Sequence, residues 1–123
     1  MTQERLSLGK KGEELAIGQL KALKYKILER NFKCPLGEID IIARDKSTLV
    51  FVEVKTRATR DFGGPAAAVD WRKQRQLSKV ALTYLNKKKL SNVPARFDVV
   101  AVELISPFPR IEVIPNAFEL CYE

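Results

Sequence analysis

The chain has 123 residues, a hydrophobic fraction of 46% and a net charge of +7, which is typical of one globular domain over 1–123. It contains no histidine, which excludes histidine-based catalytic triads and histidine-ligated metal sites. No apolar run approaches the roughly 20 residues that a membrane helix needs, and the first residues lack the apolar core of a signal peptide. We therefore expect a cytoplasmic protein, whose 22 Lys and Arg against 15 acids favour a polyanionic partner.

Apolar residues at helical spacing predict a first helix over 6–23. Its regular part is expected to begin near Lys10, because Gly9 and Gly12 weaken the first turns. Glu13 falls on the apolar face of this helix. An acid in that position either stays solvated at the helix start or points toward a functional site, so Glu13 is a candidate site residue.

A strand is predicted over 24–33, followed by a β-hairpin. Two runs of alternating residues, 38–43 and 49–56, flank the polar turn 44–47, and alternation with a short polar break is typical of a hairpin. Neighbouring residues of a strand point to opposite faces, so the hairpin side chains fall into two sets.

On the second strand of the hairpin, Phe51, Glu53 and Lys55 share the face opposite the valines. On the first strand, Glu38 and Asp40 share the face opposite the isoleucines on either side of Asp40. The alternation therefore predicts that Asp40, Glu53 and Lys55 meet on one side of the sheet.

Two carboxylates at close range repel each other unless a cation lies between them. Hard oxygen ligands favour Mg²⁺ or Mn²⁺, which can polarise a phosphoryl oxygen and lower the pKa of a bound water. Lys55 would orient that water or offset charge at the phosphate. The competing interpretation is a cross-strand ion pair of Asp40 or Glu53 with Lys55 or Arg57, and the short D…ExK spacing alone favours that ion pair.

The segment 57–65 holds two arginines, an aromatic residue and two glycines. Arg57, Arg60 and Phe62 are placed to clamp a phosphate backbone or stack a base, although a plain connector with Phe62 in the core explains the composition equally well. Asp70 is then expected to cap a helix over 71–88. Basic residues populate the polar side of this helix, among them Lys73 and Arg75.

Two further strands are predicted at the end of the chain. The first covers 96–104, and its Asp98 is expected to be structural because the hairpin already supplies an acidic pair. The second covers 110–114 and lies at an edge, because Pro115 cannot extend a ladder. The fold class predicted is α/β, with a mixed sheet of about five strands and helices on both faces.

The chain resembles a known family through several motifs in the same order. GEIDIIA at 37–43, VFVEVKTR at 50–57, Phe62-Gly63, RFDVV at 96–100 and NAF at 116–118 resemble the bacterial YraN family. Asp40 with Glu53-Val54-Lys55 looks like the active-site signature of the PD-(D/E)xK nuclease superfamily, with Ile39 where a proline is usual. The family is similar to archaeal Holliday-junction resolvases, and the resemblance implies a restriction-endonuclease-like fold.

The activity that this resemblance implies is metal-dependent cleavage of DNA, including branched DNA. Asp40 and Glu53 would hold Mg²⁺ or Mn²⁺ with Glu13 as an additional carboxylate, and Lys55 would position the attacking water. The nucleic acid, DNA rather than RNA, would lie on basic residues around the site: Arg57, Arg60, Lys73 and Arg75.

Two other functions remain open from the sequence. One is a nucleic-acid-binding module that keeps the fold without catalysis, and the other is an interaction scaffold in which the charged residues form an ion-pair network. No membrane association is expected. A resolvase that cuts two strands symmetrically requires a two-fold dimer, which makes a homodimer the assembly to test.

Overall fold

The computed structural model describes residues 3–57, 69–104 and 107–119. The elements are α1 (Gln3–Ala22), β1 (Lys26–Cys34), β2 (Gly37–Asp45), β3 (Thr48–Arg57), α2 (Trp71–Lys87), β4 (Ala95–Glu103) and β5 (Arg110–Phe118). The predicted α/β class and the order of helix, three strands, helix and two strands are confirmed. Arg60 and Phe62, which the sequence places in a loop, lie outside the described residues.

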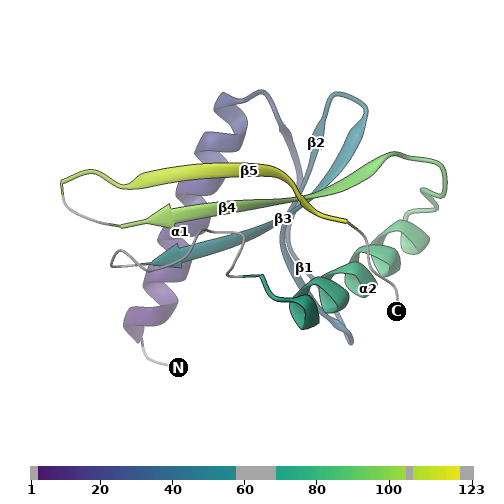
Figure 1. Ribbon diagram of the computed structural model, residues 1–123, viewed down its shortest axis with the longest axis horizontal. Coiled ribbons are helices and arrows are strands. Elements are labelled where there is room, and N and C mark those ends of the chain that lie inside the picture. Colours follow the sequence, from purple (N-terminus) through teal and green to yellow (C-terminus); the bar gives the residue numbers. More distant parts are fainter. Residues whose placement is uncertain (1–2, 58–68, 105–106, 120–123) are drawn as a thin grey trace.

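The strands form one sheet in the order β1-β2-β3-β4-β5. All neighbours are antiparallel except β3 and β4, which are parallel and are joined by the segment that contains α2. Figure 1 shows α1 crossing behind the strands and α2 beside the far end of the β1–β2 hairpin. The last strand lies at an edge of the sheet, as predicted.

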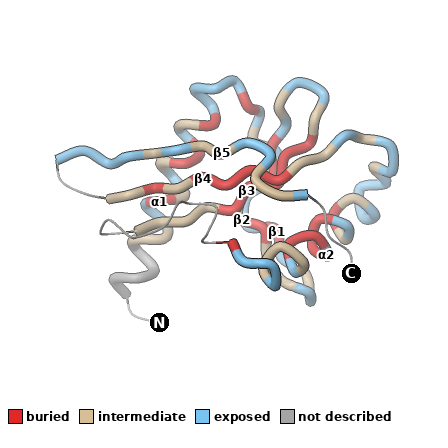
Figure 2. The backbone as a smooth tube through the Cα atoms, in the orientation of Figure 1, coloured by how far each residue is buried: buried red, intermediate tan, exposed pale blue. Residues whose placement is uncertain are grey.

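Each face of the sheet carries its own apolar layer under one helix, so the expectation of helices on both faces is confirmed. The layer under α1 includes Ala16, Leu20, Ile41, Val52 and Val100. The layer under α2 includes Phe51, Leu77, Val80, Tyr84 and Phe97. In Figure 2 the buried residues gather in the central strands and on the inner sides of the helices. Since both faces of β3 and β4 are covered, their apolar residues do not alternate with solvent-facing ones.

The first helix begins at Gln3, so the expected start of its regular part near Lys10 is wrong. Gly12 is buried, and a Cβ atom at this position would lie 1.8 Å from Oγ1 of Thr56 in β3. A glycine here lets the helix backbone approach the sheet closely. Packing against the sheet outweighs the weak helix propensity of glycine, which is worth about 1 kcal/mol.

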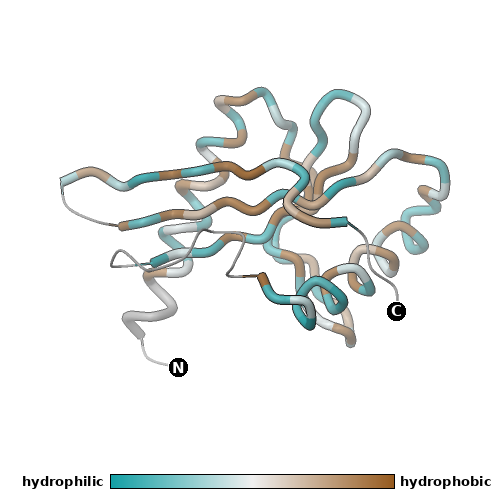
Figure 3. The backbone as a smooth tube through the Cα atoms, in the orientation of Figure 1, coloured by the Kyte–Doolittle hydropathy of each residue, from teal (hydrophilic) through white to brown (hydrophobic). Residues whose placement is uncertain are grey.

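The last strand continues through Pro115 to Phe118, so its predicted end at Ile114 is wrong. Its register with β4 shifts between Ile114 and Phe118, where the additional residues form a bulge opposite Asp98. A bulge accommodates Pro115 because it needs no ladder N–H there. The Asn116 N–H donates to Oδ1 of Asp98 at 3.0 Å, which replaces a ladder bond. Hydrophilic and hydrophobic residues alternate along this edge strand (Figure 3).

Asp98 belongs to a buried polar network, which confirms the expectation that it is structural. Its carboxylate is fully buried and accepts hydrogen bonds from Tyr25 Oη at 3.0 Å and Arg96 Nε at 3.0 Å. Arg96 also donates to Asp45 at 2.9 Å in the β2–β3 turn. The network ties the start of β1 to the start of β4, and each buried polar atom in it has a partner.

Candidate functional site

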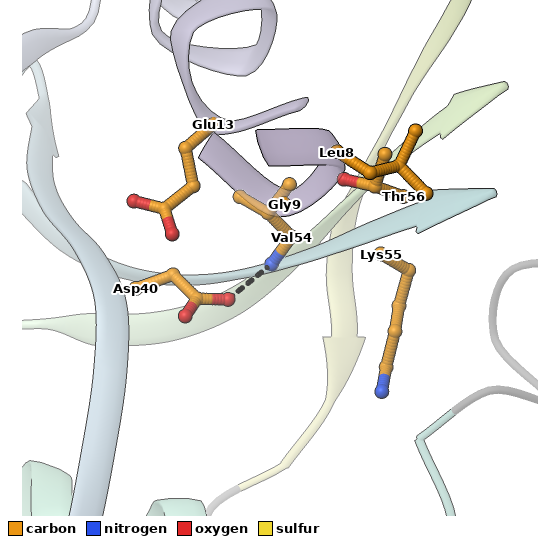
Figure 4. A pocket seen from close by; sticks show the side chains of 7 residues that line it. All are labelled: Leu8, Gly9, Glu13, Asp40, Val54, Lys55 and Thr56. Atoms are coloured by element: carbon orange, nitrogen blue, oxygen red, sulfur yellow. Dashed lines mark hydrogen bonds between the residues drawn. The ribbon is translucent and has the colours of Figure 1, made fainter. Parts of the chain in front are cut away.

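The site is built where β2 and β3 separate. The two strands pair as far as Ile41 and Val52, beyond which no further pair is formed. The Val54 N–H lies past this point and donates instead to Oδ2 of Asp40 at 2.8 Å. Figure 4 shows this bond beneath the first turns of α1. The carboxylate of Asp40 thus satisfies a backbone donor that the separation of the strands would leave unpaired.

The side-chain alternation along β2 breaks at Asp40. Ile39 packs in the layer under α2, whereas Ile41 packs in the layer under α1. The prediction that both isoleucines share one face is therefore wrong. The physical reason is the bend by which the β1–β2 hairpin leaves β3 and runs toward α2 (Figure 1). The bend places Asp40 at the junction of the two layers, where residues from either side reach it.

Asp40 and Glu53 meet at this junction, which is one part of the predicted meeting of Asp40, Glu53 and Lys55. Glu53 is buried, with 6% of its surface exposed, and its carboxyl lies within hydrogen-bonding reach of Asp40. Burial raises the pKa of Asp40 to about 7, and the neighbouring Glu53 carboxylate adds to the increase. The Val54 N–H and the charge of Lys73 act in the opposite direction. Near neutral pH, the Asp40 carboxyl is therefore only partly ionised, and a bound cation would favour its ionised form.

Lys73 comes from the first turn of α2 and contacts the same pair. Its Nζ lies 3.4 Å from Oε2 of Glu53. Asp70 caps the start of this helix, since its Oδ1 accepts the Lys73 N–H at 2.9 Å. The predicted N-cap is confirmed. An ammonium beside a buried carboxylate offsets part of the cost of burying that charge.

The point where β2 and β3 separate is called the β2–β3 fork below. An open cavity of about 580 Å³ lies on the α1 side of this fork. Its lining comprises Leu8, Gly9, Glu13, Asp40, Val54, Lys55 and Thr56. In Figure 4 the carboxyl groups of Glu13 and Asp40 lie on one side, whereas the Lys55 side chain extends away from α1. Among the described residues, Lys55 has no ion-pair partner. Lys55 thus lines the cavity, while its ammonium group points away from the two carboxyl groups.

Asn31 holds two further acids beside the cavity. Its Nδ2 donates to Oε1 of Glu13 and to Oε1 of Glu38, both at 3.1 Å. Partial burial raises the pKa of Glu13, and the charges of Asp40 and Glu38 add to this, while the Asn31 bond lowers it. Asn31 has a φ of 52°, a conformation that asparagine adopts more readily than most residues. The sequence analysis did not predict that Asn31 binds Glu13 and Glu38. The only signal was the presence of an asparagine inside a predicted strand.

The donor set fits a divalent cation through Asp40 and Glu53. Two adjacent carboxylates offer hard oxygen ligands, and their proximity favours a bound cation over two bare charges. Over residues 3–57, 69–104 and 107–119, no three acidic or cysteine side chains lie close enough to form a metal site. Water would complete the coordination shell, as is usual for Mg²⁺. In this arrangement Glu13 lines the cavity without joining the carboxylate pair.

The four predicted nucleic-acid-binding cations have different positions. Lys73 lies at the carboxylate pair, and Arg57 ends β3, where its carbonyl accepts the Leu104 N–H at 2.7 Å. Arg75 lies farther along α2, with its guanidinium 4.7 Å from the centre of the Trp71 ring. Arg60 lies outside the described residues. The described cations thus extend from the end of β3 to the outer side of α2.

Comparison with known proteins identifies a family. A family model described as uncharacterised protein family UPF0102 matches residues 12–102. The chain belongs to the UPF0102 family. A UPF0102 protein of Geobacter metallireducens is 55% identical over 122 residues, covering 99% of this chain and all of the relative. One of Geobacter sulfurreducens is 57% identical over 116 residues, covering 94% and 91%. One of Thermodesulfovibrio yellowstonii is 48% identical over 114 residues, covering 93% and 97%.

The UPF0102 match includes α1 from Gly12 onward, the hairpin, α2 and most of β4. Glu13, Asp40, Glu53, Lys55 and Lys73 all lie inside it. In the described part of this UPF0102 protein, neither helix has the length and apolar character to cross a membrane.

Proposed function

We propose that this UPF0102 protein is a metal-dependent endonuclease that acts on DNA, with branched DNA as one substrate to test. The observation that carries the proposal is the meeting of Asp40 and Glu53 at the β2–β3 fork, beside a cavity that Lys55 also lines. Burying two adjacent carboxyl groups is costly for structure alone, and the raised pKa of Asp40 reflects that cost. Its place beside a cavity is typical of a functional site.

Each residue has a role that its position supports. Asp40 and Glu53 would hold Mg²⁺ or Mn²⁺, which when bound supplies polarisation of a phosphoryl oxygen and a water of lowered pKa. Lys55 would offset the negative charge of the phosphate or orient the water. Glu13, held by Asn31 across the cavity, would accept a proton or bind a water that contacts the cation. The +7 net charge would draw the DNA backbone toward the acidic pair.

One observation supports a second candidate, the interaction scaffold. The 3.4 Å ion pair of Lys73 with Glu53 already places a cation at the buried acid. In a scaffold, however, Lys55 would be expected to neutralise the remaining carboxyl, and among the described residues it does not. The non-catalytic nucleic-acid-binding module is disfavoured for a separate reason. Binding a polyanion does not require an acidic pair, so that function leaves Asp40 and Glu53 without a role.

The test compares wild type with Asp40→Asn on branched, single-stranded and duplex DNA, with Mn²⁺ and with EDTA. We expect Mn²⁺-dependent cleavage by wild type and a loss of at least a hundredfold in the variant. Mn²⁺ should also raise the melting temperature of wild type and not that of the variant, because a ligand of the folded state stabilises it.

The control is Asp45→Asn, which changes an acid in the β2–β3 turn, at the other end of β2 from the fork. This variant should keep both cleavage and the Mn²⁺-dependent stabilisation. Cleavage that survives Asp40→Asn, or a melting temperature that never responds to Mn²⁺, would reject the metal site. A destabilised Asp40→Asn protein without any cleavage by wild type would support the scaffold.

A further inference from the structure

A second hollow lies on the outer side of α2. It has a volume of about 260 Å³ and is lined by Leu36, Arg72, Arg75, Gln76 and Lys79. Leu36 belongs to the β1–β2 turn. Its backbone carbonyl accepts a hydrogen bond from Gln76 Nε2 at 3.1 Å. This bond fixes the turn against the helix, so the hollow has one wall from α2 and one from the β1–β2 turn.

The helix wall of this hollow is cationic, and an exposed aromatic ring lies beside it. Arg72, Arg75 and Lys79 lie three and four residues apart, so they form one stripe about 10 Å long. No acid occurs between Trp71 and Lys87 to pair with them. Arg72 lies in the first turn of α2, where the helix dipole disfavours positive charge. Local helix stability therefore does not explain the stripe, whereas an anionic ligand does.

Trp71 is the only tryptophan of the chain and is 59% exposed. The guanidinium of Arg75 stacks 4.7 Å from the ring centre, which restrains the ring and adds positive charge beside it. The ring is thus presented to solvent next to a row of cationic side chains. A flat aromatic surface beside cations is the arrangement by which proteins bind single-stranded nucleic acids, with bases stacked on the ring. Bases inside a duplex are already stacked and do not offer such a face.

We infer that the α2 groove, lined by Leu36, Arg72, Arg75, Gln76 and Lys79 with the Trp71 ring beside it at Arg75, binds an unpaired nucleic-acid strand. A base stacks on Trp71 and the phosphates lie on the cations. The same first turn of α2 carries Lys73, which contacts Glu53 at the carboxylate pair. A strand held in the groove is therefore led toward the site. The inference rests on the proposed function only in naming the substrate: DNA with a single-stranded arm or branch point.

The test measures binding in EDTA, where no cleavage occurs. The ligands are a dye-labelled (dT) oligonucleotide, an abasic oligomer with the same number of phosphates, and a hairpin duplex. We expect the (dT) oligonucleotide to bind about tenfold more tightly than the abasic oligomer and to quench the fluorescence of Trp71. The duplex should leave this fluorescence nearly unchanged.

Trp71→Leu should bring the affinity for the (dT) oligonucleotide down to that for the abasic oligomer, followed by anisotropy of the dye. Phe108→Leu is the matched control, since Phe108 is 77% exposed and lies between β4 and β5. Arg75→Gln should weaken binding of both oligomers, while Arg44→Gln, an exposed arginine of β2, should not. Circular dichroism of each variant confirms that it is folded.

Equal affinity for the (dT) and abasic oligomers in wild type would overturn the inference, as would equal quenching by the duplex. A Trp71→Leu variant that alters the oligomeric state but not the affinity for (dT) would overturn it in favour of a protein interface. These results are independent of catalysis. Quenching by the (dT) oligonucleotide without any Mn²⁺-dependent cleavage would retain the groove and reject the endonuclease.

Discussion

Asp40 has a structural role and, in the proposed function, a chemical role through the same carboxyl group. It accepts the Val54 N–H where β2 and β3 separate, and it lies beside the buried Glu53. The first interaction fixes the direction of the carboxyl group, and the second makes its charge depend on what else is bound. Asn at this position keeps a carbonyl oxygen for the Val54 N–H and removes the charge.

The pH dependence of stability follows from the raised pKa of Asp40. In the unfolded chain the carboxyl titrates near 3.8, whereas in the fold it retains its proton up to about pH 7. Its stabilising contribution is therefore complete below about pH 4 and is lost as the pH rises through 7. Without metal, we expect wild type to be less stable at about pH 8 than at about pH 5 in urea denaturation.

Asp40→Asn should largely remove this difference and be the more stable protein at the higher pH. An equal loss of stability in wild type and the variant between the two pH values would show that another group is responsible.

The backbone at Asn31 predicts different stabilities for two substitutions. Asn31→Gly keeps access to the φ of 52°, whereas Asn31→Ala is strained there by roughly 1–2 kcal/mol. Both remove the amide that binds Glu13 and Glu38. We expect Asn31→Gly to be clearly more stable than Asn31→Ala in chemical denaturation, while both show the same reduced cleavage. Two variants of equal stability would mean that the left-handed conformation is not retained.

The sequence was sufficient to predict the acidic pair but not all of the contacts around it. Asp40, Glu53 and Lys55 were found through strand alternation and motif spacing, although the alternation fails at Asp40 itself. Asn31 was missed because its role depends on a backbone conformation that no periodicity reports. Lys73 was predicted as one of the cations around the site, but its contact with Glu53 depends on how α2 docks on the sheet.

At the scale of elements, α1 depends on a close approach to β3 at one glycine. Gly12→Ala would place a methyl group 1.8 Å from Oγ1 of Thr56, so helix or strand must move, at a cost of about 1–3 kcal/mol. Gly18→Ala is the matched control in the same helix, because nothing lies within 4 Å of its Cβ position. It should stabilise the protein by about 0.5–1 kcal/mol through helix propensity. Thermal unfolding of both variants checks the prediction, and two shifts of the same sign would contradict it.

The helices and strands were predicted well where a hydrophobic pattern extends over many residues. They were predicted poorly where a single proline or glycine was taken to end or weaken an element. The body of α2 and the hairpin agree with the sequence because their patterns extend over many residues. Pro115 was taken to end β5, but a bulge opposite Asp98 carries the strand past it. Gly9 and Gly12 were taken to weaken α1, but the sheet holds that helix in place.

For the whole molecule, the excess of positive charge predicts a salt-dependent affinity for DNA. Phosphates release bound cations when lysine and arginine replace them, so affinity should fall steeply between about 50 and 200 mM salt. Arg75→Gln should reduce the slope of log affinity against log salt by about one, while Arg44→Gln leaves it nearly unchanged. Anisotropy titrations at several salt concentrations measure the slope. A slope near zero in wild type would exclude binding through the phosphate backbone.

The parallel pairing of β3 and β4 has a consequence for the order of folding. The hairpin that carries Asp40 and Glu53 closes over a short loop, whereas β4 pairs with β3 only after the chain has crossed the whole of α2. Local contacts form faster than distant ones, so the carboxylate pair should assemble before Lys73 arrives. A cation that binds this pair should then speed refolding rather than only slow unfolding. Stopped-flow refolding with and without Mn²⁺ tests this, and an unchanged refolding rate would mean that the pair assembles late.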